Sequence, residues 1–242
     1  SLATGNGSAA SVVDGEATGT LVRGVRPFSA GDKNAFYDWF LNLAMAQGGG
    51  TPLRPALADV GNYYMRNDDA GPWAEIPGGT NNKAHLICRR ALHMLITDGA
   101  WNRPNAGATA KTGPGNARMA TLNLTGINVD GDVDDGPPFK DDNAGTLADV
   151  AMYYWKTNLR SDIARRDSIT PNFQEATLGR AATWPHMVNF MIGFGVTGTL
   201  RNPDDVQALI TGTKTWPAPV NDAAKIDDMW HAAWNSGGLS FS

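Results

Sequence analysis

Hydrophobic residues along the chain follow two spacings, and together these predict a mixture of helices and strands. Apolar residues at helical spacing predict helices over 32–47, 51–64, 146–156, 203–210 and 222–234. The apolar run 91–97 predicts a buried central strand, 186–196 predicts a second buried strand, and 21–28 predicts an edge strand that Pro27 limits. This order favours an α/β fold with a mainly parallel sheet, whose sites lie at the carboxyl ends of the strands.

Two helix starts and one long connection give this outline more detail. Thr51 and Thr146 each stand where an N-cap hydroxyl is expected, and Pro52 follows Thr51 at the first helical position, which favours proline. Residues 100–145 are almost wholly turn-forming, and ~45 residues is far longer than an ordinary connection of ~4–6. We expect an ordered loop insertion there and a candidate recognition surface, because binding residues gather on loops held by a rigid scaffold.

Composition excludes several classes of protein. The chain has 242 residues, 42% of them hydrophobic, which is enough for one large or two small domains with a sizeable core. Its formal charge of −4 supplies no basic surface for phosphates, so nucleic acid is not an expected partner. The longest apolar stretches fall well short of the ~20 residues needed to cross a bilayer, so no membrane span is expected.

Enzyme motifs are weak. Gly193, Gly195 and Gly198 match the Gly-x-Gly-x-x-Gly fingerprint of a nucleotide-dependent oxidoreductase, but residues 199–203 separate them from the next predicted helix. A glycine-rich strand end is the preferred interpretation. The four histidines have no metal-ligand spacing, and no serine stands in a Gly-x-Ser-x-Gly elbow, so nucleophilic or zinc chemistry has no support.

An acidic segment within the insertion has part of the spacing of a calcium loop. Asp130, Asp132 and Asp134 alternate, and Asp141 stands at the twelfth place, where hard cations find oxygen ligands. Asp135 occupies the place where the sharp turn needs glycine, and the twelfth ligand is Asp rather than the longer Glu. A calcium loop and a solvated acidic loop both remain open.

Thr51 and Asp98 form a second candidate cation site. A threonine hydroxyl after a glycine turn and an aspartate after a strand are hard oxygen donors of the kind that Mg²⁺ or Mn²⁺ accepts. The alternative is purely structural: Thr51 as an N-cap and Asp98-Gly99 as a turn.

These residues lie within a wider resemblance. The segments 49–57 and 95–102 resemble the second and third metal segments of a von Willebrand factor A domain, in the version carried by PilY-type type IV pilus tip adhesins. Further matches to that family lie at residues 24–28, 60–64, 71–73, 88–89, 128–131, 146–155 and 226–233. The resemblance covers nearly the whole chain.

The resemblance implies a von Willebrand factor A-like, Rossmann-like domain over residues 1–242, with three layers and helices on both faces of the sheet. Such domains hold an ion through Asp-x-Ser-x-Ser on the first strand, a Thr before a helix and an Asp after a later strand. Thr51 and Asp98 match the last two, and the first motif does not occur. We therefore expect a fragment that lacks the first metal-binding strand, in which a divalent cation (Mg²⁺, Mn²⁺ or Ca²⁺) binds weakly or not at all.

The family's role implies a non-enzymatic adhesion module at the pilus tip, on the cell surface, after export through the periplasm. Implied partners are minor pilins and a host or abiotic surface ligand, and implied roles are attachment and pilus assembly and retraction. An alternative is a structural scaffold that packs against minor pilins with a vestigial metal site. The single cysteine, Cys88, would then pair with a cysteine outside this piece, since exported proteins meet oxidising compartments.

Overall fold

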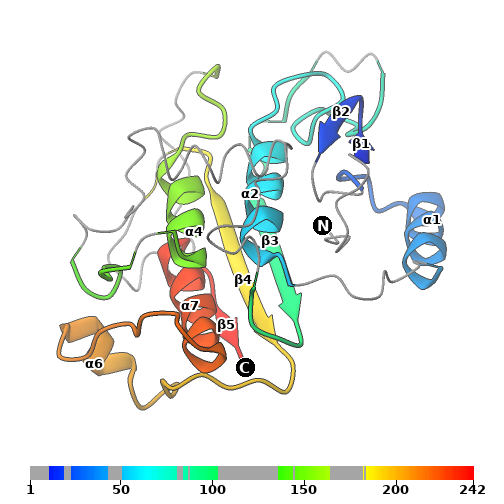
Figure 1. The fold of residues 1–242 in the computed structure, drawn as a ribbon. Helices are drawn as coiled ribbons and strands as arrows, with labels where there is room; N and C mark the ends of the chain where they lie inside the picture. The colour runs from blue at the N-terminus through cyan, green and yellow to red at the C-terminus, as the bar shows by residue number, and fades with distance from the viewer. Residues whose placement is uncertain are drawn as a thin grey trace.

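The computed structural model describes residues 11–18, 23–42, 51–80, 84–86, 88–102, 136–143, 145–163, 182 and 184–242. In chain order (Figure 1) the elements are β1 (Ser11–Val13), β2 (Glu16–Thr18), α1 (Ala30–Leu41), α2 (Leu53–Tyr64), β3 (Ala91–Thr97), α4 (Leu147–Lys156), β4 (Met187–Gly193), α6 (Val206–Thr211), α7 (Asp222–Asn235) and β5 (Ser240–Phe241).

The main sheet is parallel and has the strand order β3-β4-β5. Strands β3 and β4 pair along their full length, from Ala91 opposite Met187 to Thr97 opposite Gly193. The short strand β5 pairs with the second half of β4. The structure therefore confirms a mixed α/β fold with a parallel sheet. A strand is present over 91–97 as predicted, but among the described residues it lies at the edge of the sheet, and β4 lies at the centre.

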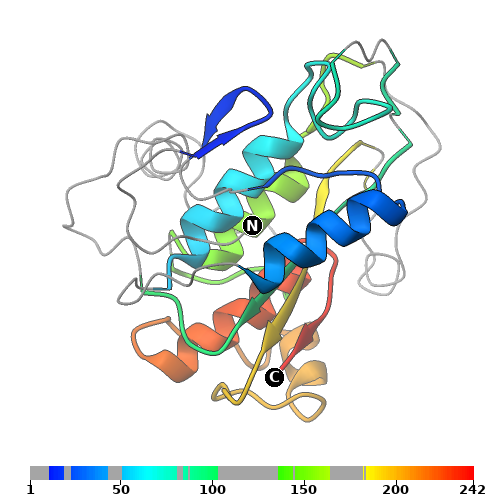
Figure 2. The same ribbon diagram turned by 90° about the vertical axis from the view of Figure 1, so that its right-hand side faces the viewer.

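Three helices form a layer against one face of this sheet. In both ribbon views α2, α4 and α7 lie together on one side of the strands, and the main hydrophobic core lies between them and the sheet (Figures 1 and 2). Helices α2 and α4 approach closely because Gly61 has no side chain where the Tyr154 ring packs. The Tyr154 hydroxyl donates to the Ala58 carbonyl oxygen, 2.9 Å away, which ties the two helices together.

The opposite face of the sheet is exposed in the described part of the chain. Side chains of β3 alternate between buried and exposed, and Leu92, Met94 and Ile96 are 50%, 58% and 54% exposed. The expected helices on both faces are therefore not what the described residues show, and β3 is half-buried rather than fully buried. The sequence could not reveal which face is covered, because the polar His93 and Thr97 lie on the buried face while the exposed face is apolar.

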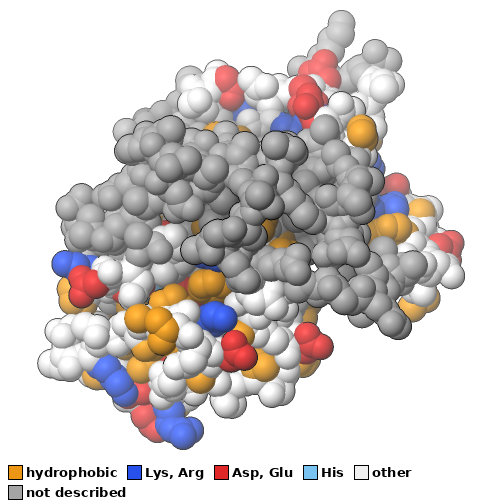
Figure 3. Space-filling view, viewed as in Figure 1, with side chains coloured by type: hydrophobic (Ala, Val, Ile, Leu, Met, Phe, Trp, Pro, Cys, Tyr) orange, Lys and Arg blue, Asp and Glu red, His pale blue; other side chains and the backbone are white. Residues whose placement is uncertain are grey.

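Helix α1 stands apart from the three-helix layer. Its side chains include exposed aromatics, with Tyr37 and Phe40 at 45% and 53%, and Phe36 stacks on Phe40 at a centroid distance of 6.0 Å. Apolar and charged side chains are mixed on its surface in the space-filling view (Figure 3). The helix predicted over 32–47 is thus present at residues 30–41, and positions 43–47 lie outside the described residues.

The predicted edge strand over 21–28 is wrong for residues 23–28, which are irregular. The strands in this region form the small antiparallel hairpin β1-β2 instead, whose turn residues Asp14 and Gly15 have positive φ values of 53° and 87°. Arg26 pairs with Asp14, and the Val25 N–H donates to the Tyr63 hydroxyl, so hydrogen bonds to the hairpin and to α2 replace a sheet ladder. An Asp-Gly pair is a hairpin signal, and it was available in the sequence.

Of the two predicted helix N-caps, one is confirmed and the other is wrong. The Thr146 hydroxyl accepts from the Asp149 N–H, and the Asp149 carboxylate accepts from the Thr146 N–H, which completes a capping box. Helix α2 instead begins at Leu53 with Pro52 at the cap position, and Thr51 makes no side-chain capping bond. Helix α6 begins at Val206 rather than at 203, because residues 202–205 form turns before it.

Within the described residues, no helix combines the length and the apolar character that crossing a bilayer requires.

A buried histidine links the two long strands and predicts a pH dependence. His93 on β3 donates from Nδ1 to Asn189 Oδ1 on β4, 2.9 Å away, and burial lowers the pKa of His93 to about 4. Since the ordinary value is 6.5, protonation favours the unfolded chain. Stability that is present above pH ~6.5 is therefore lost as the pH falls towards 4.

When the pH falls from about 7.5 to about 4.5, the unaltered chain should lose more free energy of unfolding than His93→Gln, which keeps a side-chain donor. We expect the two losses to differ by about 2–3 kcal/mol. Urea unfolding at the two pH values measures this difference, and the shared carboxylates cancel in the comparison. Equal losses in both proteins would show that His93 is not the group that titrates.

Candidate functional site

The segment before α2 and the loop after β3 meet at the carboxyl edge of the sheet. The Thr51 N–H donates to Asn102 Oδ1 at 2.7 Å, and the Asn102 N–H donates back to the Thr51 carbonyl oxygen at 3.1 Å. Asp98 follows β3 directly and precedes Asn102 in the same loop. The structure thus brings the loop that carries Asp98 to Thr51, although 47 residues separate the two positions in the numbering.

Neither Thr51 nor Asp98 has the structural role that was the alternative to cation binding, namely an N-cap for Thr51 and a turn for Asp98. Thr97, not Asp98, holds the turn: its hydroxyl donates to the Gly99 carbonyl oxygen at 2.8 Å and accepts from the Gly99 N–H at 3.1 Å. Asp98 is exposed and Thr51 is half-buried. Neither side chain forms a hydrogen bond with another described residue, which leaves a hydroxyl and a carboxylate available at one edge.

A cation-aromatic stack supports the loop after β3. The Arg54 guanidinium lies 4.0 Å from the centre of the Trp101 ring, and the Lys225 ammonium lies 5.4 Å from it. Arg54 also donates to the Gly145 carbonyl oxygen at 2.6 Å, and burial lowers the pKa of its guanidinium while the charge of Asp228 opposes that shift. No sequence pattern predicts this stack, because its members come from three separate segments.

The buried carboxylate of Asp228 joins three elements. It accepts from the Trp101 indole N–H at 2.7 Å and from the N–H groups of Leu147 and Ala148 at 2.9 and 3.0 Å. Burial raises the pKa of Asp228, and these donors oppose the rise. The start of α4, the loop after β3 and helix α7 are therefore fixed to one another at this carboxylate.

The neighbouring carboxylate explains the glycine-rich run after β4. Asp227 accepts from the N–H groups of Thr199 and Leu200 at 2.9 and 3.0 Å. A side chain on Gly198 would collide with Asp227, and Gly195 has a positive φ of 66°. Backbone amides that would face a pyrophosphate in a dinucleotide site are thus occupied by an internal carboxylate, in agreement with a glycine-rich strand end.

The acidic loop can be placed only in part. Asp130, Asp132 and Asp134 lie outside the described residues. Asp141 is buried, and its Oδ2 lies 3.2 Å from Nδ1 of His231, whose Nε2 lies 2.7 Å from the Phe139 carbonyl oxygen. In the described ranges, no three His, Cys, Asp or Glu side chains are grouped so that they could hold a metal ion.

Comparison with known proteins identifies relatives over most of the chain. The chain is 33% identical over 239 residues to the type IV pilus biogenesis factor PilY1 of Pseudomonas aeruginosa strain PAO1, and 34% identical over 242 residues to that of strain PAK. Each match covers 90% of this chain. Over most of its length, the chain is related to the PilY-type proteins.

This relationship confirms the PilY-type resemblance. The chain spans 19% of the length of these relatives. No family model matches the chain. No solved structure matches it either. Cys88, for which the resemblance implies a partner outside this piece, is exposed at the surface.

The Asp228 junction makes a prediction about stability. Asp228→Ala leaves three buried donors without an acceptor, so we expect a loss of about 3 kcal/mol or more in the free energy of unfolding. Asp228→Asn keeps one acceptor oxygen and should lose less. Asp222→Ala on the same helix is the control, because the Asp222 side chain is 87% exposed and its removal should change stability only slightly.

Urea unfolding of the three variants beside the unaltered chain measures these differences. A loss in Asp228→Ala no larger than that in Asp222→Ala would contradict the role given to this carboxylate.

Proposed function

We propose that this chain is a non-enzymatic adhesion module of a type IV pilus protein, and that it carries a weak, metal-dependent adhesion site at Thr51 and Asp98. The observation that carries the proposal is the Thr51–Asn102 clasp, which brings the loop with Asp98 to Thr51 while both polar side chains stay uncommitted to other described residues. The names of the relatives support a role in pilus biogenesis.

The chemistry of the pair favours a hard cation. A neutral hydroxyl and one carboxylate match the oxygen preference of Mg²⁺ and Mn²⁺, and an ion held by so few protein ligands keeps most of its waters. Affinity for the ion is then low, because it rises with the number of charged ligands. A carboxylate from an adhesion ligand would supply the missing charge, which fits a role in attachment to a host or abiotic surface.

The proposed fold is von Willebrand factor A-like. Three parallel strands with α2, α4 and α7 on one face agree with part of such a domain. The outer edge of β3 has no partner strand among the described residues. A further strand paired in parallel there would bring its carboxyl end beside Asp98, since the carboxyl ends of parallel strands meet at one edge.

The proposed setting is the pilus tip at the cell surface, reached through the periplasm, with minor pilins as partners. A scaffold that packs against those pilins is a second candidate, favoured by the exposed aromatic side chains of α1 and by the exposed apolar face of β3. Large exposed apolar patches commonly mark contact surfaces. In that case the pair Thr51 and Asp98 would be vestigial.

Calorimetric titration of Mn²⁺ and Ca²⁺ into the chain tests the metal site. We expect Asp98→Ala to weaken Mn²⁺ binding about tenfold or more, because it removes the only charged ligand of the pair. Thr51→Val, which keeps the side-chain shape, should weaken it by a smaller factor. Asp142→Ala is the control, since it removes an exposed carboxylate elsewhere.

A variant with Asp130, Asp132 and Asp134 changed to Ala separates the two candidate cation sites. Loss of binding in that variant alone would assign the ion to the acidic loop and contradict the site at Thr51 and Asp98. Absence of binding in every version would contradict a cation site in this chain and favour the scaffold role.

A further inference from the structure

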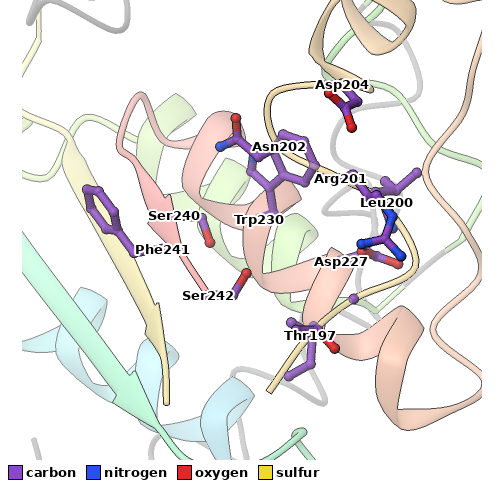
Figure 4. Close-up of a pocket in the computed structure, with 12 residues that line it drawn as sticks. Thr197, Leu200, Arg201, Asn202, Asp204, Asp227, Trp230, Ser240, Phe241 and Ser242 are labelled. Atoms are coloured by element: carbon purple, nitrogen blue, oxygen red, sulfur yellow. Dashed lines mark hydrogen bonds between the residues drawn. The ribbon is translucent and has the colours of Figure 1, made fainter. Parts of the chain in front are cut away.

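A cavity lies at the carboxyl ends of β4 and β5, apart from the site at Thr51 and Asp98. Its volume is about 440 Å³, within the ~300–1,000 Å³ of ordinary ligand sites. The loop after β4 forms one wall, α7 forms the floor with Trp230, and β5 forms the opposite wall with Ser240 and Ser242, while the Phe241 ring points away from Trp230 (Figure 4). The Asp98 loop follows β3, so this cavity belongs to a different pair of strands.

The polar side chains of this cavity are uncommitted. Arg201, Asn202, Ser240 and Ser242 line it, and none of these side chains forms a hydrogen bond or an ion pair with another described residue. Two carboxylates also line the cavity. Asp227 accepts from the loop amides, and Asp204 forms no hydrogen bond or ion pair with another described residue.

These four side chains can all donate hydrogen bonds, and Arg201 is the one among them that can only donate. Arg201 offers a guanidinium fork, Asn202 an amide group and the two serines hydroxyls, and all four line the same cavity in Figure 4. The uncommitted carboxylate of Asp204 stands at the rim, apart from the Arg201 guanidinium. The Arg201 guanidinium, which pairs with no described carboxylate, favours a ligand group that accepts hydrogen bonds and carries negative charge.

Two observations favour a carboxylate over a phosphate. The backbone amides that could hold a phosphate after β4 already hold Asp227, and the single positive charge of Arg201 is opposed by Asp204. A planar, singly charged carboxylate matches the guanidinium fork better than a doubly charged phosphate does. Leu200 and Trp230 supply apolar lining for the carbon chain that carries the carboxylate.

We propose that the cavity formed by Arg201, Asn202, Trp230 and Ser240 binds a carboxylate presented by a protein segment, either an acidic side chain or a chain terminus. The proposal does not rest on the metal site at Thr51 and Asp98. Removal of divalent cations from the protein and the buffer therefore separates it from any carboxylate that a bound cation would attract.

Isothermal titration with short peptides, in buffer freed of divalent cations by a chelating resin, tests the proposal. One probe is an acetylated and amidated peptide with a single glutamate between leucines, and a second is identical except that glutamine replaces the glutamate. A third has no acidic residue but a free carboxyl terminus after leucine. We expect the first or the third to bind at least about tenfold more tightly than the glutamine peptide, because a charge-assisted hydrogen bond is lost.

Three variants locate the binding. Arg201→Gln should weaken carboxylate binding about tenfold or more and should leave the glutamine peptide unaffected. Asp204→Asn should tighten binding by about threefold, because it removes an opposing charge. Lys33→Gln on α1 is the control for net charge and should leave the affinity unchanged.

The result for Asp98→Ala distinguishes this proposal from the previous one, since that variant should bind the peptides as the unaltered chain does. Equal affinity for the glutamate and glutamine peptides together with no binding of the free terminus would overturn the proposal. Unchanged affinity in Arg201→Gln would overturn it too, as would a failure of every peptide to bind at millimolar concentration. The proposal would be supported by the expected difference between the glutamate and glutamine peptides together with the expected changes in Arg201→Gln and Asp204→Asn.

Discussion

The arrangement of the whole carboxyl edge depends on one buried carboxylate. Asp228 gives up its hydration on burial, which raises its pKa, and recovers part of that cost from three N–H donors. Two of those donors open α4, where the helix dipole also favours a negative charge. The third is Trp101, which Arg54 stacks against. A polar contact inside the core therefore decides where the loop after β3 can lie, and with it Asp98.

The neighbouring residue on α7 organises the other side of the edge. Successive residues on an α-helix point about 100° apart, so Asp227 and Asp228 face different neighbours. Asp227 accepts hydrogen bonds from the loop after β4, which forms a wall of the cavity with Arg201. Asp228 accepts them from the start of α4 and from the loop after β3. Two adjacent carboxylates on one helix thus hold the scaffolds of both candidate sites.

Sequence patterns located the elements better than they located the contacts. Helical spacing, the Thr146 cap and the apolar run 91–97 sufficed for α4 and β3, because each signal is local. The exposed face of β3 could not be foreseen, since coverage depends on distant segments. Thr51 and Asp98 were expected at one edge from a resemblance, and the clasp with Asn102 agrees with that placement. No local pattern indicates the roles of Asp227 and Asp228 in the middle of α7, because burial is not visible in a sequence.

Most of these carboxylates already bond to other groups of the protein, which limits the ligands available to a cation. Asp227 and Asp228 accept hydrogen bonds from N–H donors, and Asp141 faces His231. Among these carboxylates, only that of Asp98 remains to bind an ion beside Thr51. Under the proposed function, a ligand that brings its own carboxylate would raise the affinity for the ion, and the ion would raise the affinity for that ligand by the same factor. A site so poor in fixed charge would then hold its cation firmly only while it holds its adhesion ligand, because the charge that binds the ion comes from both partners.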